Sequence, residues 1–171
     1  MNYMQVRGCD IANGPGIRVS LFVSGCPHHC KGCFNPESWP YDAGTHFTSK
    51  TLEEIKSFLQ KPGRTGFSLL GGEPLCTRNR DQVWWIITSL KKTFPSLNIW
   101  VYTGSTYEAL RKEGDPQIQE IFNMIDVLVD GPFIEEKKNL MLKFRGSSNQ
   151  RIIDMKQTRL QNQVVLHELN N

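Results

Sequence analysis

Short apolar runs alternate along the chain with stretches in which apolar residues recur every three or four positions. The apolar runs predict four strands, at residues 18–24, 66–70, 97–102 and 126–130. The stretches between them predict amphipathic helices, because that spacing places the apolar side chains on one helical face. Such alternation is typical of an α/β fold in which short parallel strands are joined by right-handed helical crossovers.

The predicted helices have recognisable ends as well as apolar faces. Thr51-Leu52-Glu53-Glu54 has the pattern of a capping box, and Asp115-Pro116 has that of an N-cap followed by a first helical residue. Between them, a short helical piece is expected around residues 106–112. The positions expected to face inward are Leu52, Ile55 and Leu59, then Val83, Ile86, Ile87, Leu90 and Phe94, then Ile118, Ile121, Phe122 and Ile125.

The remaining segments have weaker patterns. Residues 1–17 are mixed, and the turn-forming cluster at 13–16 predicts a loop before the first strand. Residues 35–48 are expected to be an irregular connection. Residues 144–154 are polar and then apolar, which predicts a loop leading to an edge strand, and Arg145 and Arg151 can meet a carboxylate or a phosphate there. Residues 155–171 form a tail to which the pattern assigns no role.

Composition favours one globular domain. A chain of 171 residues with 39% hydrophobic and 22% charged residues suits a single domain. The net charge of +3 is too small to argue for a nucleic-acid partner. We also see no apolar run of the roughly 20 residues needed to cross a membrane, and no signal-peptide core, so we expect a cytoplasmic protein with no membrane partner.

Three of the five cysteines, Cys26, Cys30 and Cys33, lie within eight residues directly after the first predicted strand. Thiolates are soft metal ligands, and one short loop can place three of them around one inorganic centre. No second cysteine pair follows, so one coordination position is left open, which suits a catalyst that binds its substrate at the metal. A zinc site is the alternative, completed by one of His28, His29, His46, Cys9 or Cys76.

The other strand ends carry glycine motifs: Gly71-Gly72-Glu73-Pro74, Thr103-Gly104 and Asp130-Gly131. Because the working site of barrel-like α/β folds lies at the carboxyl ends of the strands, we expect all of them to meet the cysteine loop at one mouth. The two glycines allow close approach of a ligand, and Glu73 can accept a hydrogen bond from an ammonium group. Asp130 is a possible catalytic acid or cation ligand, or it caps a turn.

Four other candidate ligands are expected to play no part in the site. We expect His28 and His29 to point to solvent, although they lie between the cysteines. Cys9 and Cys76 are interpreted as small apolar packing residues or incidental thiols.

The spacing Cys-x3-Cys-x2-Cys followed by Phe34 resembles the signature loop of radical S-adenosylmethionine enzymes. That resemblance implies a [4Fe-4S] cluster on Cys26, Cys30 and Cys33, with the amine and carboxylate of S-adenosylmethionine on the fourth iron. Gly71-Gly72-Glu73 is similar to the motif that contacts the methionyl amine in this superfamily. The residues that the resemblance assigns to S-adenosylmethionine are Phe34, Asn35, Gly71, Gly72, Glu73, Thr103, Gly104 and Asp130.

Four motifs narrow the resemblance to the family of anaerobic ribonucleoside-triphosphate reductase-activating proteins, from about residue 3 to about residue 154. They are Asn13-Gly14-Pro15-Gly16-x-Arg18, Phe34-Asn35, Asp126-x3-Asp130-Gly131 and Arg145-Gly146-Ser147-Ser148-Asn149-Gln150. The resemblance implies an incomplete, open (β/α) barrel in residues 1–154, followed by the tail at 155–171. A full eight-unit barrel needs about 250 residues, so a chain this short fits.

The activity implied by the resemblance is reductive cleavage of S-adenosylmethionine, with an electron from a donor such as flavodoxin, and removal of a hydrogen atom from a glycine of the reductase. The product is a glycyl radical on that protein. Two alternatives remain: activation of another glycyl-radical enzyme of the formate-lyase type, and a non-catalytic metal-binding module that docks a partner.

Overall fold

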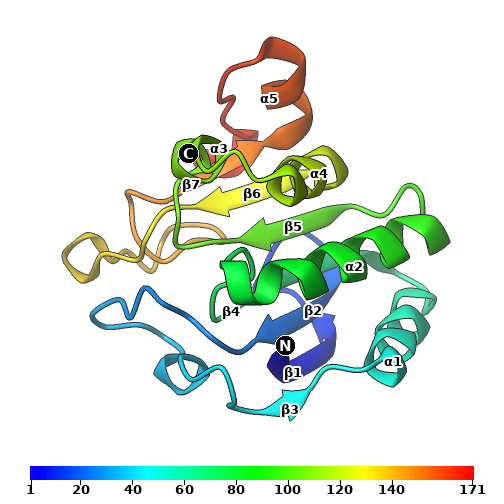
Figure 1. The fold of residues 1–171 in the computed structure, drawn as a ribbon. Coiled ribbons are helices and arrows are strands. Elements are labelled where there is room, and N and C mark those ends of the chain that lie inside the picture. Colours follow the sequence, from blue (N-terminus) through cyan, green and yellow to red (C-terminus); the bar gives the residue numbers. More distant parts are fainter.

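A computed structural model describes residues 1–171, which build one seven-stranded sheet in the order β3-β1-β2-β4-β5-β6-β7 (Figure 1). The strands are β1 Asn2–Asp10, β2 Ile17–Val23, β3 Thr45–His46, β4 Arg64–Gly71, β5 Ile99–Tyr102, β6 Val127–Asp130 and β7 Arg151–Asp154. Neighbours among β2, β4, β5 and β6 pair in parallel, as the four apolar runs predict. β1 and β7 pair antiparallel to the strands beside them, and β3 pairs antiparallel to β1. The fold is therefore mixed α/β with a parallel centre.

Two strands were not predicted. β1 lies in the mixed segment 1–17, and β3 is a two-residue strand inside the connection 35–48. The edge strand expected within 144–154 is β7.

The helices are α1 Ser49–Leu59, α2 Thr77–Thr93, α3 Tyr107–Lys112, α4 Pro116–Met124 and α5 Met155–Gln161. Short 3-10 turns occur at Pro36–Ser38, Glu135–Lys137 and Glu168–Asn170. Figure 1 shows α1, α2 and α4 over the near face of the sheet, where a core cluster of 24 buried residues lies between the two layers. Nearly all the predicted inward-facing positions are buried in this cluster, whereas Leu59 and Phe94 are only partly buried.

The helix ends match one prediction and correct another. Asp115 is the N-cap of α4, and its carboxylate accepts a hydrogen bond from the Gln117 amide at 2.8 Å. The capping box of α1 begins at Thr48 and not at Thr51. The Thr48 hydroxyl accepts from the Thr51 amide, which makes Thr51 the third helical residue, so the predicted box was three residues too late.

Arg18 explains the motif that precedes the first parallel strand. Its buried guanidinium donates to the Ser68 hydroxyl at 2.7 Å and to the Phe67 carbonyl at 2.8 Å, so β2 is tied to β4. The Ser68 hydroxyl in turn donates to the Asn13 carbonyl at 2.6 Å. This chain of bonds holds the loop between β1 and β2 in place beside the sheet.

The tail at 155–171 continues the fold instead of standing apart from it. After α5 the chain runs back along the free edge of β7, where the Asp154 amide donates to the Val165 carbonyl and the His167 amide to the Ile152 carbonyl. Leu169 packs against a second, smaller cluster on the sheet, formed by Trp100, Val127, Val129 and Ile152. The last residues therefore cover the sheet edge that β7 would otherwise leave open.

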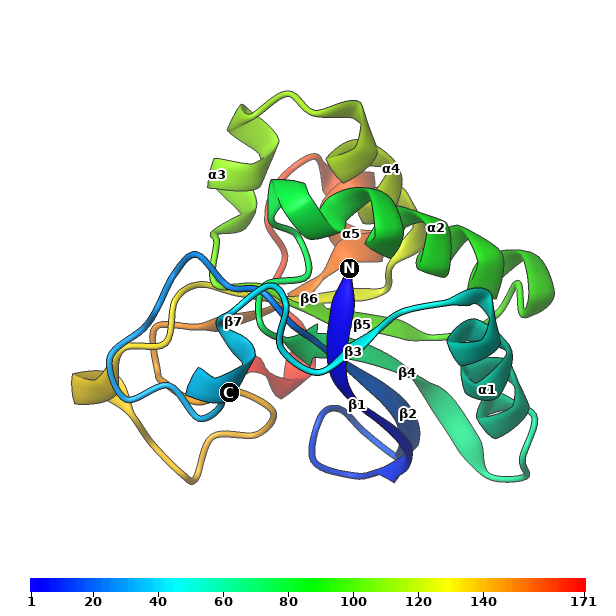
Figure 2. The same ribbon diagram turned by 60° about the horizontal axis from the view of Figure 1, so that its bottom comes forward.

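The pairing register places the carboxyl ends of the parallel strands at one level. Val23 lies opposite Gly71, and Tyr102 lies opposite Val129. Figure 2 shows the segments that follow β2 and β6 together on the left, whereas α1 and α2 lie toward the right. None of the helices has the length and apolar character that crossing a bilayer requires.

Candidate active site

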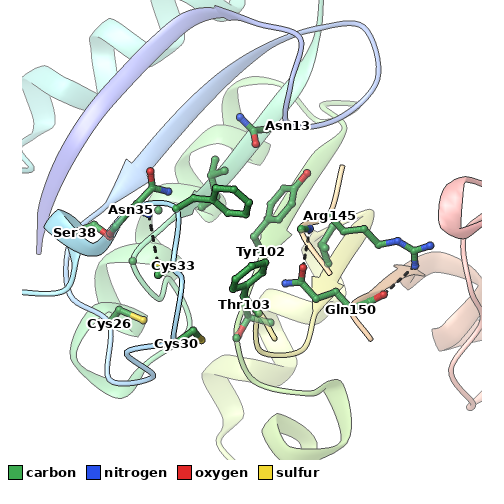
Figure 3. A pocket seen from close by; sticks show the side chains of 18 of the residues that line it. Asn13, Cys26, Cys30, Cys33, Asn35, Ser38, Tyr102, Thr103, Arg145 and Gln150 are labelled. Atoms are coloured by element: carbon green, nitrogen blue, oxygen red, sulfur yellow. Dashed lines mark hydrogen bonds between the residues drawn. The ribbon is translucent and has the colours of Figure 1, made fainter. Parts of the chain in front are cut away.

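A cavity of about 700 Å³ opens where the parallel strands end (Figure 3). Nine of the predicted site residues line it: Cys26, Cys30, Cys33, Phe34, Asn35, Gly71, Gly72, Thr103 and Gly104. The structure thus brings together the cysteine loop and the ends of β4 and β5, which come from three separate parts of residues 26–104. Glu73 and Asp130 do not line the cavity.

The cysteine loop is fixed at its start by backbone hydrogen bonds to the 3-10 turn at 36–38 and the residue after it. The Gly25 amide donates to the Ser38 carbonyl at 2.7 Å and the Cys26 amide to the Trp39 carbonyl at 3.0 Å. Burial raises the pKa of the Cys26 thiol to about 11. Figure 3 shows Cys26, Cys30 and Cys33 on the same side of the cavity. Three soft ligands from one anchored loop therefore face one space.

Gly72 allows the end of β4 to dock against this loop. Its amide donates to the Val23 carbonyl at 2.8 Å, and the next amide, that of Glu73, donates to the Gly25 carbonyl at 2.7 Å. A Cβ atom at Gly72 would lie 2.5 Å from the Gly25 carbonyl oxygen, closer than real Cβ contacts come. Any larger residue at position 72 would displace the chain directly before Cys26, so this glycine serves the cysteine loop as well as the cavity wall.

The Glu73 carboxylate is directed into the protein, away from the cavity predicted for it. It is 1% exposed and accepts four hydrogen bonds. The donors are the Leu75 amide at 2.9 Å, the Thr103 hydroxyl at 2.8 Å, the Gly104 amide at 2.7 Å and the His28 ring at 2.8 Å. Both carboxylate oxygens are therefore occupied by donors from within the protein. Glu73 thus joins the ends of β4 and β5 to the cysteine loop.

The prediction that His28 points to solvent is wrong. Its Nε2 atom lies 2.8 Å from Oε2 of Glu73, and this hydrogen bond raises the pKa of the imidazole. The ring also lines the cavity, next to Gly104. His29 is exposed as expected, with its ring stacked on Trp39 at 4.7 Å.

Asp130 is likewise held by partners inside the protein. Its buried carboxylate accepts two bonds from the Arg151 guanidinium, at 2.9 and 2.6 Å, and one from the Tyr107 amide at 2.7 Å. Arg151 also binds both oxygens of Glu108 and lowers the pKa of that carboxyl. Asp130 therefore links β6, α3 and β7, and the geometry offers it no contact with a ligand in the cavity.

Arg145 lies in the cavity wall, but its guanidinium points away from the cysteines, toward the tail (Figure 3). It donates to the Gln150 carbonyl at 2.9 Å, to Oδ1 of Asn170 at 2.6 Å and to the Asn170 carbonyl at 2.6 Å. No carboxylate pairs with it, and burial lowers its pKa. Arg145 thus fastens the segment 145–150 to the end of the chain.

Sequence reasoning missed several cavity residues. They include Arg7, Trp39, Phe133, Leu140 and Leu142, which have no motif of their own. Tyr102 also lines the cavity, and its buried hydroxyl has no hydrogen-bond partner in the protein.

The alternative zinc site finds no support in the geometry. The sulfur atoms of a zinc site lie within about 4 Å of one another, because each Zn–S bond is about 2.3 Å long. No three His, Cys, Asp or Glu side chains in residues 1–171 converge closely enough for a single metal ion. Cys26, Cys30 and Cys33 nevertheless line one cavity, so their thiols share one space.

Cys9 and Cys76 take no part in the cavity lining. Cys9 is exposed on β1, which excludes a role in packing and leaves the interpretation as an incidental thiol. Cys76 is half-buried at the start of α2, where it receives a hydrogen bond from the Tyr41 hydroxyl at 3.7 Å.

Comparisons with known proteins indicate an iron–sulfur protein. The family model described as a 4Fe-4S single cluster domain matches residues 12–153. Three similar chains are named anaerobic ribonucleoside-triphosphate reductase-activating protein. The one from enterobacteria phage T4 is 40% identical over 89% of this chain and 93% of its own length. Those from Vibrio cholerae and Escherichia coli K12 are 41% and 40% identical, each over 88% of this chain and 96% of its own.

Proposed function

The chain belongs to the family of anaerobic ribonucleoside-triphosphate reductase-activating proteins, and from this premise we propose that it activates such a reductase by radical S-adenosylmethionine chemistry. The observation that carries the proposal is the meeting of Cys26, Cys30 and Cys33 with two glycine-bearing strand ends around one cavity of about 700 Å³. That volume is within the range of pockets that enclose a small-molecule cofactor.

In this proposal Cys26, Cys30 and Cys33 hold a [4Fe-4S] cluster. When bound, the cluster supplies the electron that cleaves S-adenosylmethionine and so allows a hydrogen atom to be taken from a glycine of the reductase. The protein's own part is to bind, orient and exclude water. Gly71 and Gly72 present backbone to the cofactor, and the unpaired Tyr102 hydroxyl offers one hydrogen bond.

Phe34, Asn35, Thr103 and Gly104 line the same cavity and are the remaining proposed contacts for S-adenosylmethionine. In this proposal Glu73 and Asp130 do not contact S-adenosylmethionine themselves but support the residues that do. Glu73 holds Gly104 and Thr103 in place through its carboxylate, and Asp130 ties the end of β6 to α3 and β7.

We propose further that the sheet is a partial barrel of the radical S-adenosylmethionine type, whose open side admits a protein segment. The working domain of the proposal is 1–154, supported by the tail through Asn170. A reductant such as flavodoxin and a cytoplasmic location stay predictions.

The test begins with anaerobic cluster reconstitution and measurement of 5′-deoxyadenosine after addition of reductant and S-adenosylmethionine. Electron paramagnetic resonance on the mixture with an anaerobic ribonucleotide reductase then looks for the glycyl doublet. We expect both signals. A doublet that forms only on a formate-lyase-type enzyme would change the assigned protein substrate. If the cluster assembles but no 5′-deoxyadenosine is released, the chain would instead be a non-catalytic module that docks a partner.

A further inference from the structure

The segment at 137–147, here called the rim loop, forms one wall of the cavity opening. Asn139, Leu140, Leu142 and Phe144 from this loop line the cavity together with the cysteines. The loop lies against the cysteine loop, because Phe34 packs on Phe133 at 5.2 Å and the Lys138 ammonium lies 5.0 Å from the centre of the Phe34 ring.

The rim loop has a preformed turn. Its two arms pair at Lys138 and Ser147, and the Asn139 amide donates to the Gly146 carbonyl at 3.2 Å. At the tip, the Asn139 side chain accepts from the Met141 amide at 2.9 Å. A turn held in this way presents its side chains in one arrangement, so a partner does not have to order it on binding.

Two large apolar side chains at this tip are exposed to solvent. Met141 is 88% exposed and Leu140 82% exposed, the highest values among the exposed large hydrophobic residues of the chain. Single exposed apolar residues are ordinary, but an adjacent pair on an ordered turn at a cavity mouth is an anchor of the kind that buries itself in a partner.

The charges around the tip indicate the chemistry of that partner. Lys137, Lys138 and Lys143 form no ion pair, whereas the nearby Glu135 and Glu136 are both taken by Lys31. The tip is therefore apolar and is surrounded by positive charges. Such a tip complements a partner surface in which acidic residues surround an apolar depression.

We propose that the rim loop docks the reductase itself, with Met141 and Leu140 in an apolar depression and the free lysines against acidic residues around it. This inference rests on the proposed function, because a protein segment that enters the cavity must pass this loop. Leu140 belongs to both surfaces, since it lines the cavity and stands at the tip.

The test uses Met141→Asp and Lys143→Glu in the full chain with its cluster reconstituted. The matched controls are Leu160→Asp, at a residue 71% exposed on α5, and Lys50→Glu, at an exposed residue of α1. We expect each rim-loop variant to raise the Kd for the reductase at least tenfold in biolayer interferometry, and the KM for the reductase in glycyl-radical formation to rise with it. The controls are expected to stay within twofold of the parent.

Deoxyadenosine release without reductase separates failure of this inference from failure of the proposed function. If the parent releases deoxyadenosine and the Met141→Asp chain binds the reductase as tightly as the parent, the docking assignment is wrong. It is also wrong if Met141→Asp changes only the sedimentation of the free protein, because the tip would then join copies of this chain. A parent that releases no deoxyadenosine refutes the proposed function, whatever the Kd values.

Discussion

Replacement of Glu73 by glutamine separates the two roles that this side chain can have. Sequence similarity assigns it to the ammonium group of S-adenosylmethionine, whereas the structure gives it four donors within the protein. Glutamine has the same shape but only one oxygen. If that oxygen accepts from Leu75 and Thr103, the glutamine NH2 group points at the Gly104 N–H. Both groups are donors, so no hydrogen bond can form between them.

The loss of folding stability in Glu73→Gln can be worked out from the hydrogen bonds that change. The half-buried Gly104 amide loses a bond to a charged acceptor, which is worth about 1.5–3 kcal/mol. The hydrogen bond to His28 no longer involves a charged group, which weakens it by about 1 kcal/mol. The glutamine NH2 group and the Gly104 N–H are then two donors that face each other, which adds a similar penalty. We expect the free energy of unfolding to fall by about 3–5 kcal/mol in total, or roughly 6–20 °C in Tm for a chain of this size.

The assay is anaerobic urea unfolding of the cluster-free chain, followed by circular dichroism, with S-adenosylmethionine affinity measured by calorimetry on the reconstituted protein. For the unfolding measurement alone, Thr103→Val is the control, because it removes one neutral donor to the same carboxylate and the acceptor for the Ser105 amide, at about 1 kcal/mol each. An unchanged unfolding midpoint in Glu73→Gln, together with a weakened affinity for S-adenosylmethionine, would refute the structural role and restore the direct contact.

Three further predictions concern other parts of the molecule. Cys33→Ala is expected to lose iron and sulfide on reconstitution while Cys76→Ala keeps them, and chemical analysis of both elements decides this. Asn170→Ala is expected to speed amide hydrogen exchange in residues 145–150, whereas Asn170→Asp preserves protection, because its carboxylate accepts the same two bonds. The hydrogen bond from Arg80 lowers the pKa of Asp115, so its stabilisation is present above about pH 4 and is lost as the pH falls through the lowered value. Urea unfolding of parent and Asp115→Asn chains is therefore expected to differ at pH 6, and the difference is expected to shrink as the pH falls below about 4.

The central fold is predictable from the sequence because its strands are buried on both faces and appear as continuous apolar runs. β1 gives no such signal. Most of its residues are exposed or half-buried, and Gly8 and Cys9 interrupt the alternation near its end. Its pairing with β2 has two register shifts, between Tyr3 and Gln5 and between Arg7 and Asp10, so a strict alternation is not kept along the strand. The position of the tail at 155–171 is not predictable from local pattern either, because its hydrogen-bond partners lie along β7.

Convergence of the cysteine and glycine motifs at one cavity is predictable because parallel strands end at one edge of a sheet. The side-chain direction of a carboxylate at such an edge is not. Glu73 turns inward because Thr103 and Gly104, about 30 positions later, supply donors for it. Asp130 turns inward because Arg151 arrives from β7. Sequence similarity places both residues near the site without telling whether they contact the ligand or support the residues that do.

The coverage of the β7 edge by residues 165–170 has a consequence for behaviour at high concentration. An open strand edge that carries Ile152 and Ile153 is a template on which other copies can add strands and aggregate. Here the carbonyls of Val165 and Ile152 and the Asn170 side chain take part in bonds that close most of that edge. The opposite edge ends in β3, which is only two residues long. Edge-to-edge polymerisation is thus disfavoured at the β7 end of the sheet, whereas β3 pairs with only Asn2 and Tyr3 of β1 at the other end.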